Sequence, residues 1–282
     1  MSKRKLEERF FKTLMLISLL AVLGSLLLIL GTVAWRGLPA LNVAMITQTP
    51  KGGYYLGREG GILNAIVGSL YLAGGATLLS AVLSLPIVLH LHFYAARTRR
   101  ADLVRLAMDV LWGIPSIVYG AFGFTIMMWL GVRASLLGGM ITLALLELPI
   151  MVRGMDETAA LVPAALKEAS AALGATRLET AGRVVIRQAA PGLLTAVLLA
   201  FGRGIGDAAS VLFTAGYTDR LPASLLGPAA SLPLAVFFQL GTPFPAVQER
   251  AYAAALVLIV IVLGLSLASR ILFKRLSQYV IR

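Results

Sequence analysis

The run LLAFGRGIGDAASVLFTAG, residues 198–216, has the apolar character of a membrane-spanning helix, and yet it carries two charged side chains. Arg203 and Asp207 lie four residues apart inside it. A charged side chain at the centre of a bilayer costs about 2.5–3.5 kcal/mol even on the mildest scale. Residues four apart share one face of a helix, so the two side chains can contact each other. The run therefore predicts a span in which an arginine and an aspartate compensate each other.

The rest of the chain repeats this apolar character. Of its 282 residues, 59% are hydrophobic and 13% are charged, whereas soluble domains carry about 25% charged residues. About 20 apolar residues cross a bilayer as a helix. The fold class that we predict is all-α, a single polytopic membrane domain over residues 1–282. Its six spans are expected at about 13–35, 64–92, 109–130, 136–152, 190–213 and 251–273.

Lysine and arginine are distributed unevenly between the segments that flank these spans. The segments on one side of the membrane hold eighteen of them, and the segments on the other side hold six. Cytoplasmic loops of membrane proteins carry an excess of these residues, which predicts that both termini are cytoplasmic. The same distribution explains the net charge of +12 without nucleic acid as a partner.

The longest segment on the basic side, residues 153–189, has the signals of two helices separated by a break. Pro163 suits the first turn of a helix, and Gly174 suits its end in the left-handed conformation. Thr176 and Glu179 form a capping box, which begins a second helix that runs towards Pro191. A plain connector rarely needs 37 residues with two helices. We expect both helices at the membrane surface, where they dock a cytoplasmic partner.

The sequence EASAALGATRLETAGRVVI in this segment resembles the cytoplasmic signature of ABC importer permeases. That signature has E-A-A, then a glycine after three residues, then an apolar residue ten positions on. The matching residues here are Glu168, Ala169, Ser170, Gly174 and Val184. Arg187 stands where the family usually has a proline. The resemblance implies a coupling helix that sits in a cleft of the ATPase subunit.

Four further stretches resemble the PstA-type membrane subunit of bacterial phosphate importers. They are IPSIVYGAFG (114–123), LPIMVRGMDETAALVP (148–163), APGLLTAVLLAFGRGIGDAASVLFTAG (190–216) and AYAAALVLIVIVLGL (251–265). The resemblance covers a core of about residues 60–275, and the ending VLFTAG favours this subunit over the sister PstC-type permease. The family usually has Arg-x-x-x-Glu where this chain has Arg203 and Asp207, so the acid is one methylene shorter.

The resemblance also implies a set of partners. No G-x-x-x-x-G-K-[ST] phosphate-binding loop occurs in the sequence, so ATP and Mg²⁺ would be bound by a separate ATPase subunit. We expect a PstC-like second permease, a PstB-like ATPase dimer and a PstS-like binding protein, with membrane lipid around the spans. We expect no cofactor, no metal and no enzymatic activity in this chain itself. The implied location is the bacterial cytoplasmic (inner) membrane.

Arg203 and Asp207 have two compatible interpretations. They are either an internal pair that neutralises both charges, or a point on the path of an anionic substrate. The planar fork of arginine matches the oxygens of phosphate, and the acid beside it would compete with the anion and weaken its retention. The resemblance implies a passage at the interface of two permease subunits.

Glu147 interrupts the fourth span and has the same two interpretations. It could line the path, or it could pair with a neighbour on its own helix such as Arg153. We expect Gly202 and Gly206 to form a small-x-x-x-small face for close helix approach.

Two other classes of transporter stay open at this stage. One is a permease of the same architecture for another oxyanion, such as molybdate or sulfate. The other is a stand-alone secondary anion transporter. That class usually has two related halves, and this sequence has no internal repeat.

Overall fold

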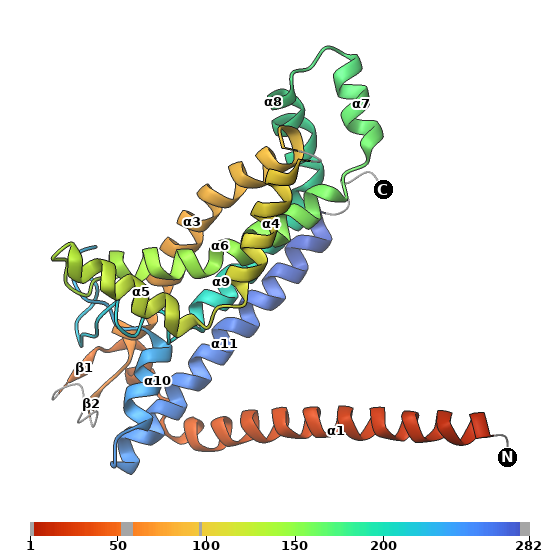
Figure 1. Ribbon diagram of the computed structural model, residues 1–282. Coiled ribbons are helices and arrows are strands. Elements are labelled where there is room, and N and C mark those ends of the chain that lie inside the picture. Colours follow the sequence, from red (N-terminus) through yellow and green to blue (C-terminus); the bar gives the residue numbers. More distant parts are fainter. Residues whose placement is uncertain (1–2, 52–58, 96–97, 277–282) are drawn as a thin grey trace.

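The computed structural model describes residues 3–51, 59–95 and 98–276, and most of them are helical (Figure 1). The long helices are α1 (Lys3–Gly37), α3 (Leu63–Phe93), α6 (Leu136–Ala160), α9 (Ile186–Ile205) and α11 (Pro245–Leu276). The shorter ones are α2 (Val43–Thr47), α4 (Arg99–Trp112), α5 (Ser116–Trp129), α7 (Ala164–Ala172), α8 (Arg177–Glu179) and α10 (Leu232–Leu240), with a 3-10 turn at Leu38–Ala40. Strands β1 (Pro50–Lys51) and β2 (Glu59–Gly60) pair antiparallel. Three of the arginines in the count of basic residues on the two sides of the membrane lie outside the described residues: Arg58, Arg97 and Arg282.

Five helices of the described part of the chain are long and apolar enough to cross a membrane. A sixth crossing results if α4 and α5 together count as one span, although the two helices meet at 99°. The span expected at about 109–130 is therefore present only as a sharply bent pair of helices. The bend falls at Gly113, which caps α4, and at Pro115, which precedes α5. Proline lacks an N–H group and disfavours the helical conformation of the residue before it.

The centre of the bundle consists of α3, α6 and α9, and α11 packs along α9. Small residues allow the close approach of these helices: Gly154 of α6 lies against Ala196 of α9, and Gly192 of α9 lies against Thr158 of α6. Close packing of this kind drives helix association in lipid, where burial of apolar side chains gains little. Helix α6 contributes more buried side chains to both apolar clusters of this centre than any other helix.

The connections divide between two ends of the bundle (Figure 1). Strands β1 and β2, the turn between α5 and α6 and helix α10 lie at one end, and the C-terminal end of α3, helix α7 and the end of α11 lie at the other. Gly131 adopts a φ of 66°, which suits the short turn between α5 and α6. These segments divide as the count of basic residues assumes, except that the N-terminal end of α1 lies apart from the α7 end.

Helix α9 ends at Ile205, earlier than the predicted 213, and a chain of turns follows as far as Ser231. This segment is pinned by backbone hydrogen bonds: the Ser135 N–H donates to the Thr214 carbonyl at 2.8 Å, and the Ala229 N–H donates to the Ala215 carbonyl at 3.0 Å. Irregular backbone at membrane depth is tolerated only where protein groups satisfy it.

The signals in the predicted docking segment are confirmed in part. Helix α7 begins after Pro163, Gly174 adopts a φ of 81°, and both hydrogen bonds of the capping box between Thr176 and Glu179 are present. The second helix is not a separate surface helix. It continues from α8 through a π-helical stretch (Thr180–Val185) into α9 and passes Pro191 without a break. Since α6 also extends to Ala160, only residues 161–176 project beyond the bundle.

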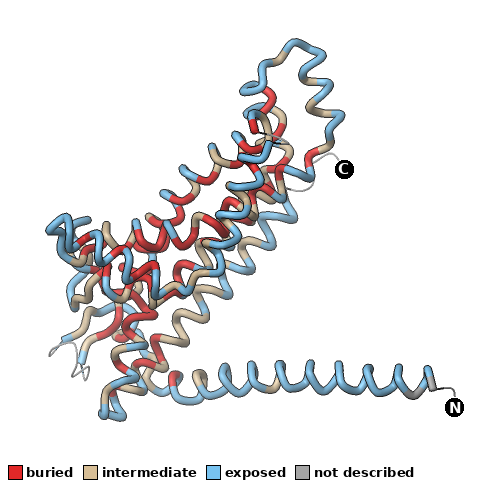
Figure 2. The backbone as a smooth tube through the Cα atoms, in the orientation of Figure 1, coloured by how far each residue is buried: buried red, intermediate tan, exposed pale blue. Residues whose placement is uncertain are grey.

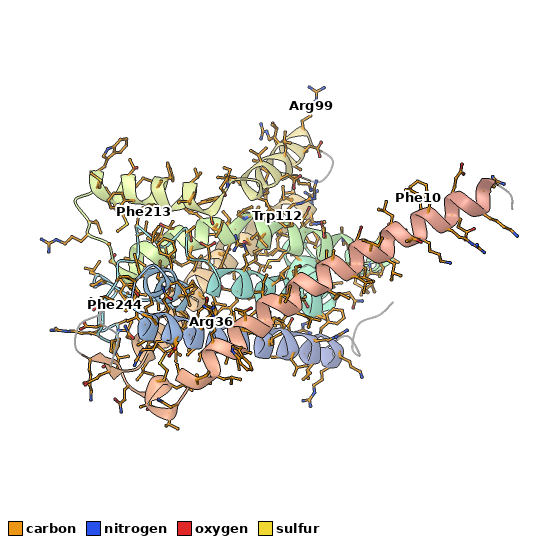
Figure 3. All side chains as sticks on the ribbon, turned by 90° about the horizontal axis from the view of Figure 1, so that it is seen from below. Phe10, Arg36, Arg99, Trp112, Phe213 and Phe244 are labelled. Atoms are coloured by element: carbon orange, nitrogen blue, oxygen red, sulfur yellow. The ribbon has the colours of Figure 1, made fainter. Side chains whose placement is uncertain are left out.

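Helix α1 stands apart from the bundle along most of its length. The apolar stretch of α1 that could cross the membrane contains no buried residue, and most of this helix is pale blue in Figure 2. Contact is confined to its end, where Arg36 lies against the bundle, while Phe10 lies far from it (Figure 3). There the Arg36 guanidinium stacks 5.3 Å from the ring centre of Tyr252 in α11.

Candidate functional site

Arg203 and Asp207 contact each other at the end of α9. The Nη1 atom of Arg203 lies 3.2 Å from Oδ1 of Asp207. The two side chains differ sharply in exposure, because 48% of the arginine side chain is exposed and 3% of the aspartate side chain is exposed. The predicted contact is therefore confirmed, although the two residues do not share a helix face. Gly206 caps α9, so Asp207 is the first residue of the turns that follow.

Asp207 is held by its surroundings as well as by the arginine. Its Oδ2 atom accepts a hydrogen bond from the Ser210 N–H at 2.8 Å, and its own N–H donates to the Gly204 carbonyl at 3.1 Å. A carboxylate that accepts a backbone N–H and faces a guanidinium has its charge compensated. Asp207 therefore acts as a fixed anchor, and Arg203 is the partner that reaches outwards.

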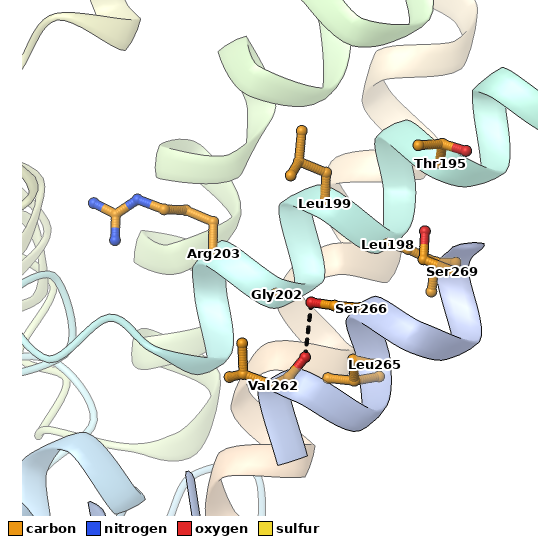
Figure 4. Close-up of a pocket in the computed structure, with 9 residues that line it drawn as sticks. All are labelled: Thr195, Leu198, Leu199, Gly202, Arg203, Val262, Leu265, Ser266 and Ser269. Atoms are coloured by element: carbon orange, nitrogen blue, oxygen red, sulfur yellow. Dashed lines mark hydrogen bonds between the residues drawn. The ribbon is translucent and has the colours of Figure 1, made fainter. Parts of the chain in front are cut away.

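Arg203 lies at one end of a groove between α9 and α11 with a volume of about 430 Å³ (Figure 4). Its guanidinium points away from the α11 side of this groove, whereas Ser266 of α11 is bonded to its own helix. The neighbouring residue on this face of α9, Leu199, is 64% exposed. A guanidinium and a leucine side by side on an exposed face leave this part of α9 open to a second protein surface.

Glu147 lies on the opposite side of α9 from this exposed face. It is completely buried, and its Oε2 atom accepts a hydrogen bond from the Thr77 hydroxyl at 2.8 Å. Its Oε1 atom packs directly against Gly204 of α9. Glu147 therefore contacts α9 one residue from Arg203, but through the core of the bundle and not through an open path.

Two expectations about neighbouring residues are wrong. Arg153 does not pair with Glu147, because its Nε atom lies 2.9 Å from Oδ1 of Asp109 on α4. Gly202 and Gly206 do not form a close-packed face, since no residue of a neighbouring element lies within 4 Å of the position of a Cβ atom on either. The close approach is made at Gly204, between them. Sequence spacing identified the glycine-rich stretch, but not which glycine faces the core.

The predicted coupling residues are grouped on α7 and the turn after it. Glu168 and Ala169 are exposed. The Ser170 hydroxyl shares a hydrogen bond of 2.9 Å with the Thr180 hydroxyl, which ties α7 to the helix that leads into α9. Gly174 turns the chain between them and is exposed.

A charged cluster at this same end of the bundle escaped the sequence analysis. Asp156 of α6 accepts two hydrogen bonds from Arg105 of α4, at 2.8 and 3.3 Å, and its Oδ1 atom lies 2.9 Å from Nε2 of His92 of α3. One carboxylate thereby joins three helices. The only available sequence signal was an acid in a basic segment, and its partners lie 51 and 64 residues away in the chain.

Comparison with known proteins decides the family. Residues 93–281 match the model of the family described as binding-protein-dependent transport system inner membrane component. The phosphate transport system permease protein PstA of Haemophilus influenzae is 34% identical over 96% of this chain and 95% of that protein. The chain belongs to the PstA family of these permeases. The PstA protein of Pasteurella multocida is 32% identical, over 98% of this chain and 97% of its own length.

Solved structures agree with the fold of a PstA-type permease. A chain of the bacterial alginate ABC transporter aligns over 99% of this chain and 99% of its own, with a TM-score of 0.66 and 14% identity. A chain of the MetNI methionine ABC transporter aligns over 76% of this chain and 95% of its own, with a TM-score of 0.62 and 17% identity. The chain is thus a multi-pass membrane permease subunit of the ABC importer class, as predicted.

Proposed function

We propose that this permease carries inorganic phosphate, and that Arg203 contacts the anion in the membrane passage. The observation that carries the proposal is the geometry at the end of α9: a half-exposed guanidinium next to a buried, anchored carboxylate. The relatives that carry phosphate transport in their names span nearly the whole chain, which supports the same substrate.

The chemistry of the pair suits passage better than tight binding. The fork of Arg203 presents paired N–H donors to a tetrahedral oxyanion, and it stays charged at all physiological pH values. Asp207 competes for the same donors at 3.2 Å, so a bound anion is released again. The arginine alternates between its carboxylate partner and the passing phosphate, and Asp207 keeps it compensated when the passage is empty.

The exposed face of α9 requires a second permease to complete the passage. With the described residues alone, 48% of the Arg203 side chain and 64% of Leu199 stay exposed on that side. We assign this place to a PstC-like subunit, so that the passage lies between the two permeases. A PstS-like binding protein would deliver phosphate at the end that carries β1 and β2.

The energy would come from a PstB-like ATPase dimer that holds ATP and Mg²⁺. Residues 161–176 project from the opposite end of the bundle, with Glu168 and Ala169 on the exposed side of α7. We assign the helical hairpin of residues 161–176 to the cleft of the ATPase. We infer that Ser170 and Gly174 hold this hairpin in its shape. This assignment, together with the excess of basic residues, puts both termini on the cytoplasmic side of the bacterial inner membrane.

A transport assay on the complete complex tests this function. The permease is reconstituted with its co-purified partners, and ATP-dependent uptake of labelled phosphate, sulfate and molybdate is compared. Uptake of phosphate well above that of the other two supports the proposal. Preference for sulfate or molybdate would assign the same architecture to another oxyanion. Uptake without ATPase or binding protein would indicate the stand-alone transporter, which membership of a binding-protein-dependent family disfavours.

A further inference from the structure

A pocket of about 280 Å³ lies between the hairpin at residues 161–176 and the end of α3. His92 and Phe93 form its wall on α3, and the helix that leads into α9 contributes Arg177 and Thr180. Helix α7 closes it with Lys167 and Ala171, together with Ala175 from the turn. The pocket is remote from Arg203, which lies at the far end of α9.

The two cations of this pocket have no anionic partner among residues 3–51, 59–95 and 98–276. Arg177 donates to the Phe93 carbonyl at 3.4 Å and lies 5.9 Å from the ring centre of Tyr94, and neither contact neutralises its charge. No ion pair or hydrogen bond is found for the Lys167 ammonium in the same part of the chain. Two cations that line one hollow without a counter-charge favour an anion between them.

Two of the nearby carboxylates are already engaged, and a third, Glu168, lies on the exposed side of α7. Asp156, behind His92, is held by Arg105 at 2.8 Å. Glu179 accepts the hydrogen bonds of the capping box from Thr176, and its other oxygen lies 3.9 Å from Arg183. These acids therefore leave the charges of Lys167 and Arg177 to an anion that is not part of the chain.

The pocket is on the inner side of α7, away from the surface assigned to the ATPase. Lys167 and Ser170 are half-buried on the side that faces the bundle, whereas Glu168 and Ala169 are exposed on the other side, and Leu173 at the tip is 88% exposed. A docked ATPase would cover the outer face and leave the hollow behind α7 for a small anion.

We propose that this pocket binds a phosphate-bearing anion at the cytoplasmic end of the permease, between Lys167 and Arg177. The inference rests on the proposed function for its substrate and its orientation. The anion joins α7 to the helix that continues into α9 and holds the hairpin against α3. Inorganic phosphate that has accumulated in the cytoplasm thereby slows further transport, because the hairpin must move relative to the bundle when the ATPase acts.

The test uses the complete complex in vesicles of phosphatidylcholine, with the ATPase facing the bath. Binding protein and labelled phosphate are enclosed in the lumen, and ATP with increasing unlabelled phosphate is added outside. We expect the wild-type transport rate to fall about fivefold at millimolar bath phosphate, a factor typical of coupling between two sites. The double variant Lys167→Gln/Arg177→Gln loses this dependence, and Lys167→Arg keeps it. Arg187→Gln, an exposed residue further along the same helix, is the matched control and behaves as wild type.

The measured quantity is the ratio of the rates at low and high bath phosphate, so a lower absolute rate in a variant does not affect the comparison. Equal inhibition of wild type and double variant would overturn the inference, since the phosphate would then act at the ATPase. No transport by any variant at low bath phosphate would instead refute the proposed function.

A second arm identifies the source of the anion. Part of the phosphatidylcholine is replaced by phosphatidylglycerol, without bath phosphate. Inhibition that depends on Lys167 and Arg177 under this condition assigns the pocket to a lipid headgroup, and its absence assigns the pocket to free phosphate. If the double variant loses its ATPase subunit on purification and neither phosphate nor phosphatidylglycerol has an effect, the cations serve the ATPase and the inference is wrong.

Discussion

Gly204 lets Glu147 pack closely against α9, on the opposite side of the helix from the exposed Arg203 side chain. The absence of its side chain lets the Glu147 carboxylate pack directly onto the backbone of α9, next to Arg203. Asp207 lies just after the end of α9, where its backbone N–H donates a hydrogen bond to the Gly204 carbonyl. The side chains of Glu147, Arg203 and Asp207 are thus arranged around one glycine of the GRGIG stretch.

Substitution of Gly204 tests this arrangement. A Cβ atom at Gly204 would collide with Oε1 of Glu147, so Gly204→Ala is expected to lower the stability of the permease by about 1–3 kcal/mol, as overpacking does. Gly202→Ala, two residues away in the same helix, meets no neighbouring atom within 4 Å and is expected to be neutral. The measurement is the unfolding temperature of each purified variant in detergent. An equal fall of the unfolding temperature in both variants would show that the glycine is needed for the geometry of α9 and not for the contact with Glu147.

Single-residue predictions succeeded where the signal was local. The spacing of Arg203 and Asp207 correctly predicted their contact, and the capping box at Thr176 is present as expected. Predictions failed where the partner came from another helix, as for Arg153 and its bond to Asp109. The spacing of hydrophobic residues identifies the face of a helix that packs against the protein only when that face is more apolar than the others. In these spans the other faces are apolar as well, so the spacing does not identify the packed face.

At the scale of elements, the spans could be placed from the sequence but their ends and bends could not. Helix α6 runs to Ala160 and absorbs the start of the predicted loop, whereas α9 stops at Ile205. Pro191 was expected to begin a new helix, yet the chain passes through it as one helix with a π-helical stretch before it. Pro115 does separate two helices, because Gly113 ends α4 just before it.

The turn after α7 gives the prediction at this scale. Gly174 has a φ of 81°, a conformation that costs a residue with a Cβ atom about 1–2 kcal/mol. We expect Gly174→Val to shift the hairpin, so that the permease still reaches the membrane but stimulates its ATPase less. Gly264→Val is the control, since Gly264 lies in α11 with no atom within 4 Å. ATPase rates of the two purified complexes are compared; wild-type stimulation by Gly174→Val would mean that the hairpin is only a connector.

At the scale of the whole molecule, the count of basic residues and the structure give the same division for the connections of the bundle, whereas the N-terminal end of α1 lies away from the α7 end (Figure 1). The segments counted as basic, around α7 and at the end of α11, lie together, and the β1–β2 hairpin and α10 lie opposite (Figure 1). The direction of the chain in the membrane follows from the eighteen-to-six asymmetry alone. The exposed length of α1 had no counterpart in the sequence analysis, because apolar runs do not distinguish lipid from protein contact.

Single cysteines test this orientation without background, because the sequence contains none. We expect cysteines at Gln48 and Gln248 to react with an impermeant reagent added to intact cells from outside. A cysteine at Leu173, which is 88% exposed at the tip of the hairpin, is expected to react only after the cells are opened. Reaction at Leu173 in intact cells would invert the orientation and remove the hairpin from the ATPase.

The central claim is that Arg203 serves the passage of the anion and not the stability of the fold. Arg203→Gln is therefore expected to reduce phosphate uptake about 10- to 100-fold, the loss of one charge-assisted hydrogen bond of about 1.5–3 kcal/mol. Arg203→Lys is expected to lie between, because lysine keeps the charge and loses the fork. Asp207→Asn is expected to release phosphate slowly, and Asp207→Glu to transport at a nearly normal rate.

The decisive measurement is the amount of permease in the membrane and the uptake of labelled phosphate, determined in the same cells for Arg203→Gln. The account predicts a normal amount of protein with uptake reduced about 10- to 100-fold. A purely structural pair would behave differently, because removal of either partner strands a charge and costs several kcal/mol. Loss of the protein in both Arg203→Gln and Asp207→Asn, with normal amounts and intact uptake in the Arg203→Gln/Asp207→Asn double variant, would contradict it.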